Sequence, residues 1–514
     1  MLPAELQGLL DPRAYPHAVG SVRVVETHIS WLLLTGDYAY KIKRPVVFPF
    51  LDFRALERRE FFCREELRLN RRFAPELYLA VVQIVRSNGR LRIDAAGEPI
   101  EYAVRMRQFA AADELGALLA DERVTVGELE RFGDDLARIH AELPVLPSLA
   151  EPERTRRMLL DNAAQCALAA VDDRVRAAVE DCRSQLAARI EAQAELLDQR
   201  DRGGRIRDCH GDLHVSNVAR VGGRLRAFDC LEFEPEFRRI DVAHEIAFLA
   251  MDLTAHGRGD LAGAFLNGWL VNSGDYQSVE LLDLYEAHCA LVRAKVAGLN
   301  VTRVAPAESN ALAARQRNFV ALASERLAPH RPRLLLMHGV SGSGKSWLAA
   351  RLAYALDGIW LRSDVERKRL AGLLPLARTG SRPDRDLYSV EHNAATYASL
   401  LEKVQHVLRG GRTAIVDATF LTAASRMPFM RLARERRVPI VVLACQAPVE
   451  ELERRVQARG AQGTDPSEAT VDVLHRQLAR VEPPDPVEGA AVLPVDTCKP
   501  DIVATLLPSL CVAG

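Results

Sequence analysis

A glycine-rich loop between an apolar run and an apolar-periodic stretch is the feature that most restricts the fold. Residues 339–346 read Gly-Val-Ser-Gly-Ser-Gly-Lys-Ser, after the run 334–337 and before the stretch 347–356. This order predicts a strand, a phosphate-binding loop and a helix. Backbone N–H groups of such a loop turn inward around a β-phosphate, and the start of the helix adds its positive dipole end. A flexible glycine-serine linker is the alternative, and the flanking strand and helix argue against it.

The side chains of this loop have separate expected roles. Its glycines permit the backbone angles and the close approach that phosphate binding needs. Lys345 is expected to reach the β- and γ-oxygens and to take part in catalysis, while the Ser346 hydroxyl can hold Mg²⁺. The residues expected to bind the nucleotide are Gly339, Ser341, Gly342, Ser343, Gly344, Lys345 and Ser346.

A second signature, His-Gly-Asp-Leu-His-Val-Ser-Asn at residues 210–217, belongs to a different kind of ATP site. A kinase catalytic loop needs an aspartate that orients and deprotonates the attacking hydroxyl, and an amide oxygen a few residues on that holds Mg²⁺. Asp212 and Asn217 have that spacing. A turn at residues 221–224 then leads to Asp229, the expected second Mg²⁺ ligand. The chain is therefore predicted to be a tandem phosphotransferase.

Three side chains in this region have other interpretations. His210 and His214 could share Zn²⁺ if they lay on a helix, but the intervening Gly-Asp favours a loop, and no third ligand lies at short spacing. Asp241 starts an apolar-periodic helix, so we interpret it as a structural residue that caps the helix.

The stretch from His210 to Asp229 resembles the aminoglycoside phosphotransferase family, small-molecule kinases of the protein-kinase-like fold. The resemblance covers residues 20–325 and is strongest over residues 206–253. It implies an α+β bilobal domain in which His210 braces the catalytic loop from the core. It also implies that the strand at residues 101–106 supplies the hinge that contacts the adenine.

An N-terminal lobe with a phosphate-binding lysine should precede this catalytic loop. Residues 29–34 and 38–43 read as two strands joined by a tight turn, and Lys41 and Lys43 project from the same face of the second. One of them is expected to contact the α- and β-phosphates and to pair with a glutamate on the next helix. The resemblance favours Lys43, and an exposed strand charge is the alternative for each lysine.

The helix at residues 56–73 offers three glutamates for this ion pair: Glu60, Glu65 and Glu66. Glu65 is counted with Lys41 and Lys43 among the expected nucleotide-binding residues, and the choice among the three stays open. No Gly-x-Gly-x-x-Gly precedes the strand. Another loop must then cover the phosphates, so the sequence does not decide between ATP and GTP.

Short β-rich runs alternate with helical stretches after residue 333, at residues 413–416, 439–444 and 491–495. This alternation predicts an α/β doubly wound parallel sheet. Asp364 would follow the second strand, where it can position the acceptor hydroxyl, and Asp417 would end a later strand, where it can reach the Mg²⁺ shell. Helix capping is the alternative for both carboxylates.

Arg455 and Arg459 precede a loop at residues 460–464 and are expected to bind the transferring phosphate when this lid closes. The segment resembles the small P-loop kinases grouped with gluconate kinase, zeta-toxin-like and polynucleotide-kinase-like enzymes. The whole arrangement resembles bacterial proteins described as bifunctional aminoglycoside-phosphotransferase-family and ATP-binding proteins.

Four segments are expected: a kinase-like N-lobe, a helical C-lobe with the catalytic loop, a proline-containing linker and a P-loop kinase domain. Their predicted boundaries are residues 1–109, 110–327, 328–332 and 333–514. The proline break implies that few contacts need cross it. The two halves are therefore expected to bind nucleotide independently.

Composition narrows the remaining functions. A net charge of -1 over 514 residues gives no general attraction to polyanions. The nine cysteines are scattered without a Cys-x-x-Cys, which favours a reducing cytosol and argues against a zinc module. The sequence lacks a signal-peptide pattern and an apolar run of membrane-spanning length. A cytoplasmic protein without a membrane partner is expected.

Two sites for ATP (or GTP) and Mg²⁺ are expected, each transferring the γ-phosphoryl group to a small hydroxylated acceptor. One alternative is a single active kinase whose other half acts as a nucleotide sensor or scaffold. The other is a polynucleotide-end kinase, which makes nucleic acid a less favoured partner. The motifs fix neither the acceptor nor the oligomeric state.

Overall fold

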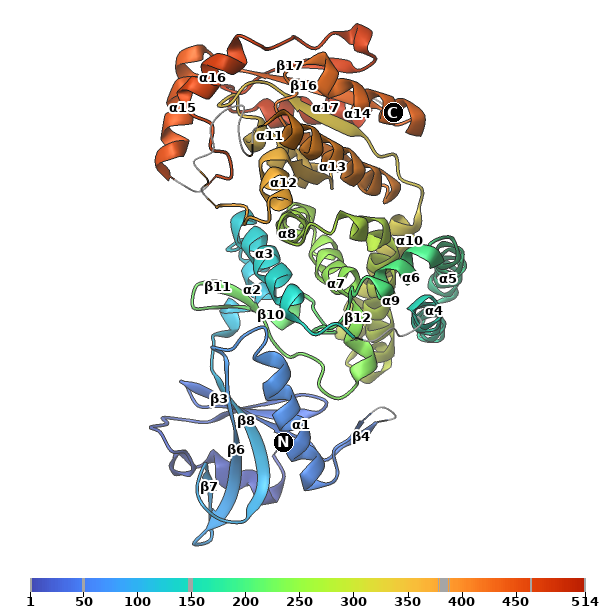
Figure 1. The fold of residues 1–514 in the computed structure, drawn as a ribbon. Coiled ribbons are helices and arrows are strands. Elements are labelled where there is room, and N and C mark those ends of the chain that lie inside the picture. Colours follow the sequence, from blue (N-terminus) through green and yellow to red (C-terminus); the bar gives the residue numbers. More distant parts are fainter. Residues whose placement is uncertain are drawn as a thin grey trace. The chain divides into compact units, whose positions relative to one another are not determined.

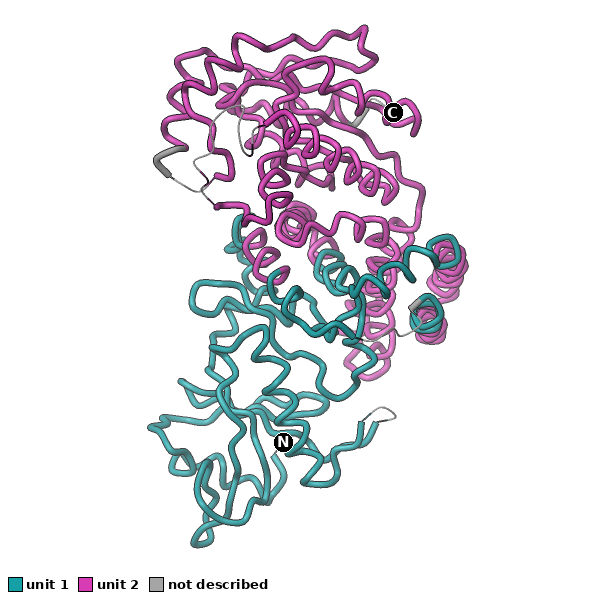
Figure 2. Tube along the Cα trace, in the orientation of Figure 1, with its two compact units in different colours: residues 1–128, 138–158, 190–252 teal, residues 129–137, 159–189, 253–514 magenta. Residues whose placement is uncertain are grey.

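In the computed structural model the described residues are 2–48, 51–146, 151–377, 379, 387, 389–462 and 465–512. They divide into two units that are discontinuous in sequence (Figure 2). Unit 1 comprises residues 1–128, 138–158 and 190–252, and unit 2 comprises residues 129–137, 159–189 and 253–514.

Unit 1 contains a six-stranded antiparallel sheet in the order β1-β2-β3-β8-β6-β7, with helix α1 packed against β6 and β8 (Figure 1). These elements are β1 Arg23–Glu26, β2 Ser30–Leu34, β3 Tyr38–Lys43, β6 Tyr78–Ser87, β7 Arg90–Ile93, β8 Pro99–Arg107 and α1 Leu56–Asn70. The short strands β4 Val47–Phe48 and β5 Leu51–Asp52 pair with each other. The last five residues of β3 are buried, which places both of its lysines inside the lobe.

The rest of unit 1 carries the catalytic loop between two short strand pairs. β9 Ile206–Asp208 pairs with β12 Arg239–Asp241, and the hairpin β10 Val218–Val221 with β11 Arg224–Ala227 follows the loop. The flanking helices are α2 Leu115–Ala120, α3 Val126–Glu142, α4 Glu151–Leu168, α6 Ala194–Arg202 and α7 Val242–Ala255; α3, α4 and α7 continue into unit 2.

Unit 2 contains a five-stranded parallel sheet in the order β14-β15-β13-β16-β17. The strands are β13 Leu334–His338, β14 Ile359–Arg362, β15 Ala414–Asp417, β16 Ile440–Gln446 and β17 Ala491–Asp496. Its helices are α11 Lys345–Ala355, α12 Ser363–Leu370, α13 Val390–Arg409, α14 Ala423–Arg436, α15 Val449–Gln462, α16 Val471–Leu478 and α17 Ile502–Val512. The central strands β13 and β15 are buried throughout and apolar up to their last residues, His338 and Asp417, as parallel strands covered on both faces are. The predicted fold class, a kinase-like domain followed by a doubly wound P-loop domain, is confirmed.

Unit 2 also includes helices that the sequence assigns to the kinase-like half: most of α5 Asp173–Ala192, and all of α8 Gly259–Ser273, α9 Val279–Asn300 and α10 Pro306–Leu327. Arg412, just before β15, donates from Nη2 to Asp283 (2.7 Å) and Glu286 (3.0 Å) on α9. Arg326 on α10 bridges Glu286 (2.6 Å) and Asp357 (2.8 Å). The expectation that few contacts cross the proline break is therefore wrong, because a buried charge network joins both sides.

The eight cysteines whose side chains the structure describes are free, and all of them but Cys498 are buried. Burial raises the pKa of the Cys209 and Cys230 thiols, which agrees with their interpretation as small buried residues beside the catalytic loop. Among the described residues, no helix has the length and apolarity that crossing a bilayer requires.

Candidate active sites

Two lysines of β3 meet one glutamate of α1 in unit 1. Glu66 forms ion pairs with both lysines: Lys41 Nζ lies 2.7 Å from its Oε1, and Lys43 Nζ lies 2.7 Å from its Oε2. Lys41 also pairs with Asp229, and Lys43 with Glu232. Burial opposes ionisation of Glu66, but the charges of Lys41 and Lys43 outweigh it and lower the pKa of this carboxyl. The glutamate of the predicted ion pair is thus Glu66.

Glu65, which is among the nucleotide-binding residues expected from the sequence, does not take part in this ion pair. It accepts a hydrogen bond from Arg68 at 2.8 Å, and Glu60 pairs in the same way with Arg64. Successive residues of a helix are rotated by about 100°, so only one of the two neighbours Glu65 and Glu66 can face the sheet. Packing of α1 on β6 and β8 selects Glu66, which is fully buried.

The two lysines differ in what they can reach. Lys43 is 0% exposed and lies between Glu66 and Glu232, whereas Lys41 contacts Asp229, whose side chain is 47% exposed. The geometry therefore favours Lys41 as the lysine that faces a ligand, where the resemblance favoured Lys43. Glu232 was not anticipated, since nothing in its sequence context distinguishes it from other glutamates.

Asp229 adopts an unusual backbone conformation. Its φ of 63° lies in the left-handed region, which costs energy for a residue with a Cβ and is typical of functional sites. Its N–H donates to the hydroxyl of buried Tyr78 at 3.0 Å, which helps to hold the turn. Desolvation opposes ionisation, but the neighbouring Lys41 charge lowers the pKa of Asp229 and keeps it anionic.

The catalytic loop brings Asp212 and Asn217 together. The Asn217 Nδ2 donates to the backbone oxygen of Asp212 at 2.9 Å and to its carboxylate at 3.1 Å. The segment is a loop followed by one 3₁₀ turn, which agrees with the preference for a loop over a helical zinc pair. His210 is buried and lies 2.9 Å from the Phe228 carbonyl; burial lowers its pKa, so the neutral ring can donate this bond. His210 thus braces the loop, as the resemblance implied.

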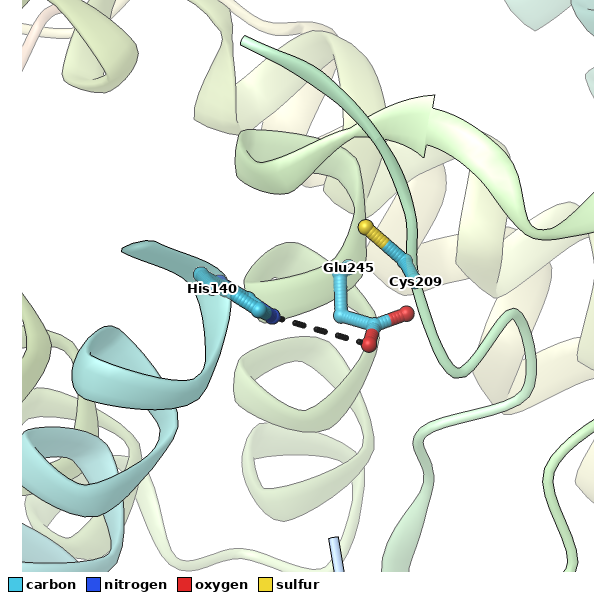
Figure 3. A group of neighbouring side chains, drawn as sticks. All are labelled: His140, Cys209 and Glu245. Carbon is cyan, nitrogen blue, oxygen red and sulfur yellow. Dashed lines mark ion pairs between the residues drawn. The ribbon is translucent and has the colours of Figure 1, made fainter. Parts of the chain in front are cut away.

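A buried glutamate supports the same loop, and its side chain lies beside those of His140 and Cys209 (Figure 3). Glu245 on α7 accepts the N–H of His210 at 2.7 Å and the N–H of Gly211 at 2.9 Å, and His140 lies 3.7 Å from it. His140, Cys209 and Glu245 lie within 4.8 Å of one another, close enough to share a metal ion. Both Glu245 oxygens already accept loop N–H groups, so the arrangement is that of a structural brace. No motif in the sequence marks Glu245 for this role.

Two further residues complete this support. Gly211 has a φ of 84°, and a Cβ there would meet the Phe237 oxygen at 2.9 Å, so only glycine fits. Asp241 receives buried Arg200 at 2.6 and 2.7 Å and the Ala243 N–H at 2.8 Å. Its structural interpretation agrees with these contacts.

The P-loop of unit 2 lies between β13 and α11, as predicted. Lys345 is buried and donates to the Val340 oxygen at 2.8 Å, across its own loop. A Cβ at Gly342, whose φ is 83°, would meet the Leu452 oxygen at 2.7 Å. Arg455 donates to Thr497 at 2.9 Å and to the Gly342 oxygen at 3.3 Å, so it contacts the P-loop backbone.

Two carboxylates flank this loop at the carboxyl ends of neighbouring strands. Asp417 ends β15 and accepts from Trp360 Nε1 at 3.2 Å. Burial raises the pKa of Asp417, while Arg362, Lys345 and a hydrogen bond with Ser346 oppose that rise. Asp364 lies in the first turn of α12, after β14, and receives Arg367 at 2.8 Å. It is not the N-cap, which is Arg362.

A cavity of about 370 Å³ joins these groups. Its walls include Ser341, Lys345, Ser346, Asp364, Asp417, Arg459, Arg476, Gln477 and Arg480. Residues 463 and 464 of the expected lid loop, and the side chains of 460–462, lie outside the described residues. Instead, helix α16 approaches the P-loop, and Gln477 Oε1 accepts the Ser341 N–H at 2.7 Å. Sequence reasoning missed Gln477, since no motif marks it.

Comparison with known proteins places these sites in a class. A model of the phosphotransferase enzyme family matches residues 58–282, and a model of an AAA domain matches residues 334–484. These matches define a kinase-like phosphotransferase domain followed by a P-loop kinase domain. The chain is 32% identical over 465 residues to the uncharacterized protein Rv2004c of Mycobacterium tuberculosis, covering 89% of this chain and 90% of that protein. The chain belongs to the same family as Rv2004c.

Solved structures resemble each half separately. A gluconokinase from Sinorhizobium meliloti 1021 is 21% identical and covers 35% of this chain and 93% of its own, with a TM-score of 0.25. A choline/ethanolamine kinase family protein from Mesorhizobium loti is 13% identical and covers 60% and 92%, with a TM-score of 0.37. Both TM-scores are below 0.5, so the classification rests on the two family models and on Rv2004c, and these two structures add no argument.

Proposed function

We propose that the chain is an ATP- and Mg²⁺-dependent phosphotransferase with two nucleotide sites. Each site would transfer the γ-phosphoryl group to a hydroxyl group of a small molecule. The observation that carries this proposal is that each unit assembles its own set of a lysine, metal-binding oxygens and a second carboxylate. Such a set is what phosphoryl transfer needs, because catalysis there is mostly positioning and charge stabilisation.

In unit 1, Asp212 would orient the acceptor hydroxyl and take its proton. Asn217 and Asp229 offer an amide oxygen and an ionised carboxylate, which is a donor set that suits Mg²⁺. Lys41 would bind the α- and β-phosphates, held in place by Glu66. The brace by Glu245 keeps the loop that carries Asp212 in position.

In unit 2, the P-loop backbone and Lys345 would bind the phosphates. The Ser346 hydroxyl and the Asp417 carboxylate are adjacent hard oxygen donors and fit Mg²⁺. Mg²⁺ held by these two oxygens would supply positive charge that offsets the charge of the transferring phosphoryl group. Arg459, on the cavity wall, would bind the γ-phosphate, and Arg455 would steady the loop from outside the cavity. Asp364, oriented by Arg367, would accept the acceptor proton.

The transfer step is the same at both sites. The acceptor oxygen forms a bond to the γ-phosphorus, and the bond from that phosphorus to the β,γ-bridging oxygen breaks. The acceptor proton moves to the aspartate carboxylate, Asp212 or Asp364, and ADP leaves with the bridging oxygen. No oxidation or reduction is involved.

The proposal is tested with the full chain, ATP, Mg²⁺ and a small-molecule cell extract, followed by mass spectrometry for products heavier by one phosphoryl group. Parallel reactions use Asp212→Asn and Asp364→Asn, each expected to abolish a different product. Calorimetry with a non-hydrolysable ATP analogue counts the sites, with Lys345→Ala and Asp229→Asn each expected to remove one. A single bound nucleotide in the unmutated chain contradicts the two-site proposal and favours the sensor or scaffold alternative. Phosphorylation of added oligonucleotide ends alone favours the polynucleotide kinase.

A further inference from the structure

The parallel sheet of unit 2 has an edge strand next to its active site. β14 is the first strand in the order β14-β15-β13-β16-β17, so on one side of it no strand of the described residues pairs with it. Its residues Ile359, Trp360 and Leu361 are nevertheless buried. Buried backbone N–H and C=O groups need partners, and an edge strand must obtain them from outside its sheet.

Helix α8 supplies those partners through one side chain. The Trp360 N–H donates to Asn267 Oδ1 at 2.7 Å, and Asn267 Nδ2 donates to the Gly358 oxygen at 3.0 Å. The amide therefore pairs with β14 as a neighbouring strand would. Asn267 is 1% exposed, and α8 packs directly on β14 and α11. The hydroxyl of Tyr276, after α8, lies 3.4 Å from the Trp360 oxygen and completes the edge.

Trp360 connects this edge to the metal-binding carboxylate. Its backbone is held by Asn267, and its indole Nε1 donates to Asp417 Oδ2 at 3.2 Å. Both Trp360 and Asp417 are buried, so water does not readily replace this bond. Three consecutive hydrogen-bonded groups thus run from α8, outside the P-loop domain, to the carboxylate beside Ser346.

We propose that Asn267 is a positioning residue for the metal-binding carboxylate Asp417, and that it acts through the indole of Trp360. The inference rests on the proposed function of Asp417 at the P-loop site. Hydrogen-bond donors to a metal-binding carboxylate fix its orientation, and their removal typically weakens metal binding by about 10- to 100-fold. Loss of either link should therefore weaken the use of Mg²⁺ while leaving metal-free nucleotide binding intact.

The test uses the full chain carrying Lys41→Met, which removes the phosphate-facing charge of unit 1 both with and without Mg²⁺, so that this site contributes little. Calorimetry measures the affinity for a non-hydrolysable ATP analogue with Mg²⁺ and with EDTA. Trp360→Phe keeps an aromatic ring but loses the donor, and it should weaken the Mg²⁺-dependent affinity by about tenfold without changing the EDTA value. Trp347→Phe, at an exposed tryptophan of α11, is the matched control and should change neither.

Asn267→Ala should also weaken the Mg²⁺-dependent affinity. Asn272→Ala, on the same helix, is the control and should leave this affinity unchanged. Combined with Trp360→Phe, Asn267→Ala should add little, because both changes break one path. An additive double variant, or an unchanged Mg²⁺ dependence in Trp360→Phe, overturns the proposal; the Trp360→Phe result decides alone if Asn267→Ala does not fold. Absence of any Lys345-dependent binding in the parent chain would instead contradict the proposed function.

Discussion

The charges around β3 form a closed set of two lysines and three carboxylates in unit 1. Lys43 is completely buried between Glu66 and Glu232, so its charge neutralises these two carboxylates and does not face a ligand. Lys41 shares Glu66 but also touches Asp229, which solvent reaches. Removing one member of a fully buried pair leaves an uncompensated charge, whereas a partner that reaches water can be hydrated instead. The two lysines should therefore respond differently to the same substitution.

Lys43→Met is expected to destabilise unit 1 by about 3–5 kcal/mol, since Glu232 and Glu66 stay buried without it. Lys41→Met should cost less stability and weaken ATP binding at this site by more than tenfold, because it removes the phosphate-facing charge. Chemical denaturation and nucleotide titration of both variants, in a Lys345→Ala chain, separate the effects. Equal losses of stability in the two variants would contradict this division of roles.

Asp212 and Asp229 should also separate into catalysis and binding. Asp212→Asn keeps a hydrogen-bond acceptor for Asn217 but cannot take a proton, so product formation by unit 1 should fall by at least about 100-fold with near-normal Mg·ATP affinity. Asp229→Asn should weaken Mg·ATP binding itself. Product formation and calorimetry on both variants check this asymmetry, and the reverse pattern would exchange the two assignments.

At the level of elements, helix α16 approaches the P-loop through one amide. Gln477 accepts the N–H of Ser341, and its neighbours Arg476 and Arg480 line the same cavity. This contact fixes the helix relative to the phosphate-binding backbone. Arginines carried by a closing element are effective only when that element is held in position.

Gln477→Ala is therefore expected to lower kcat of the unit 2 reaction by about tenfold while unfolding parameters stay near those of the parent chain. Gln477→Glu should also raise KM for ATP, because a carboxylate would stand beside the incoming phosphates. His475→Ala, an exposed position of the same helix, is the control. Steady-state kinetics measure this effect; an unchanged kcat in the Gln477→Ala chain would show that the contact between α16 and the P-loop does not affect the reaction.

The sequence was informative where function depends on residues close together in the chain. The P-loop, Asp212, Asn217 and Asp229 could be predicted because each motif carries its own spacing and local geometry. Glu66 could not be separated from Glu65, since helix rotation is set by packing against a sheet. Glu245 contacts a loop 34 residues away, and Asn267 contacts a strand 93 residues away. No local pattern encodes such contacts.

For the whole molecule, the main consequence is that unit 2 is built from three separate parts of the chain. Arg412, Arg326 and His330 meet Asp283, Glu286 and Asp357 in one network, of which His330 and Asp357 are partly exposed and the other four are buried. His330 lies 3.0 Å from Asp283, within the segment predicted as a linker. That segment is therefore part of the unit's packing and contributes charge to it.

His330 gives this network a pH dependence. Its hydrogen bond with Asp283 raises the pKa of His330 above 6.5, although partial burial and the Arg412 charge act against that rise. A raised folded-state pKa stabilises the fold fully below about pH 6.5 and less as the pH rises through the raised value. The parent chain should thus lose about 0.5–1 kcal/mol from this pair between pH 6 and pH 8. Urea unfolding of His330→Gln should lack this difference, and an identical slope in both chains would refute it.

A fragment of residues 333–514 should not fold as a stable domain, although the proline break predicts two halves that bind nucleotide independently. The fragment keeps Arg412 and Asp357 but loses Asp283, Glu286 and Arg326, and it exposes β14 by losing Asn267. Arg412 would keep one of its three carboxylate partners, and this loss of charge partners and the open strand edge each favour aggregation over folding. Co-expression with residues 1–332 should restore a soluble, co-purifying pair that binds a nucleotide analogue at the P-loop. Expression and gel filtration measure the solubility and association of the fragments, and thermal unfolding measures their stability. A monomeric fragment that unfolds at the temperature of the full chain's unit 2 transition would show that the helices only adjoin the sheet and do not complete it.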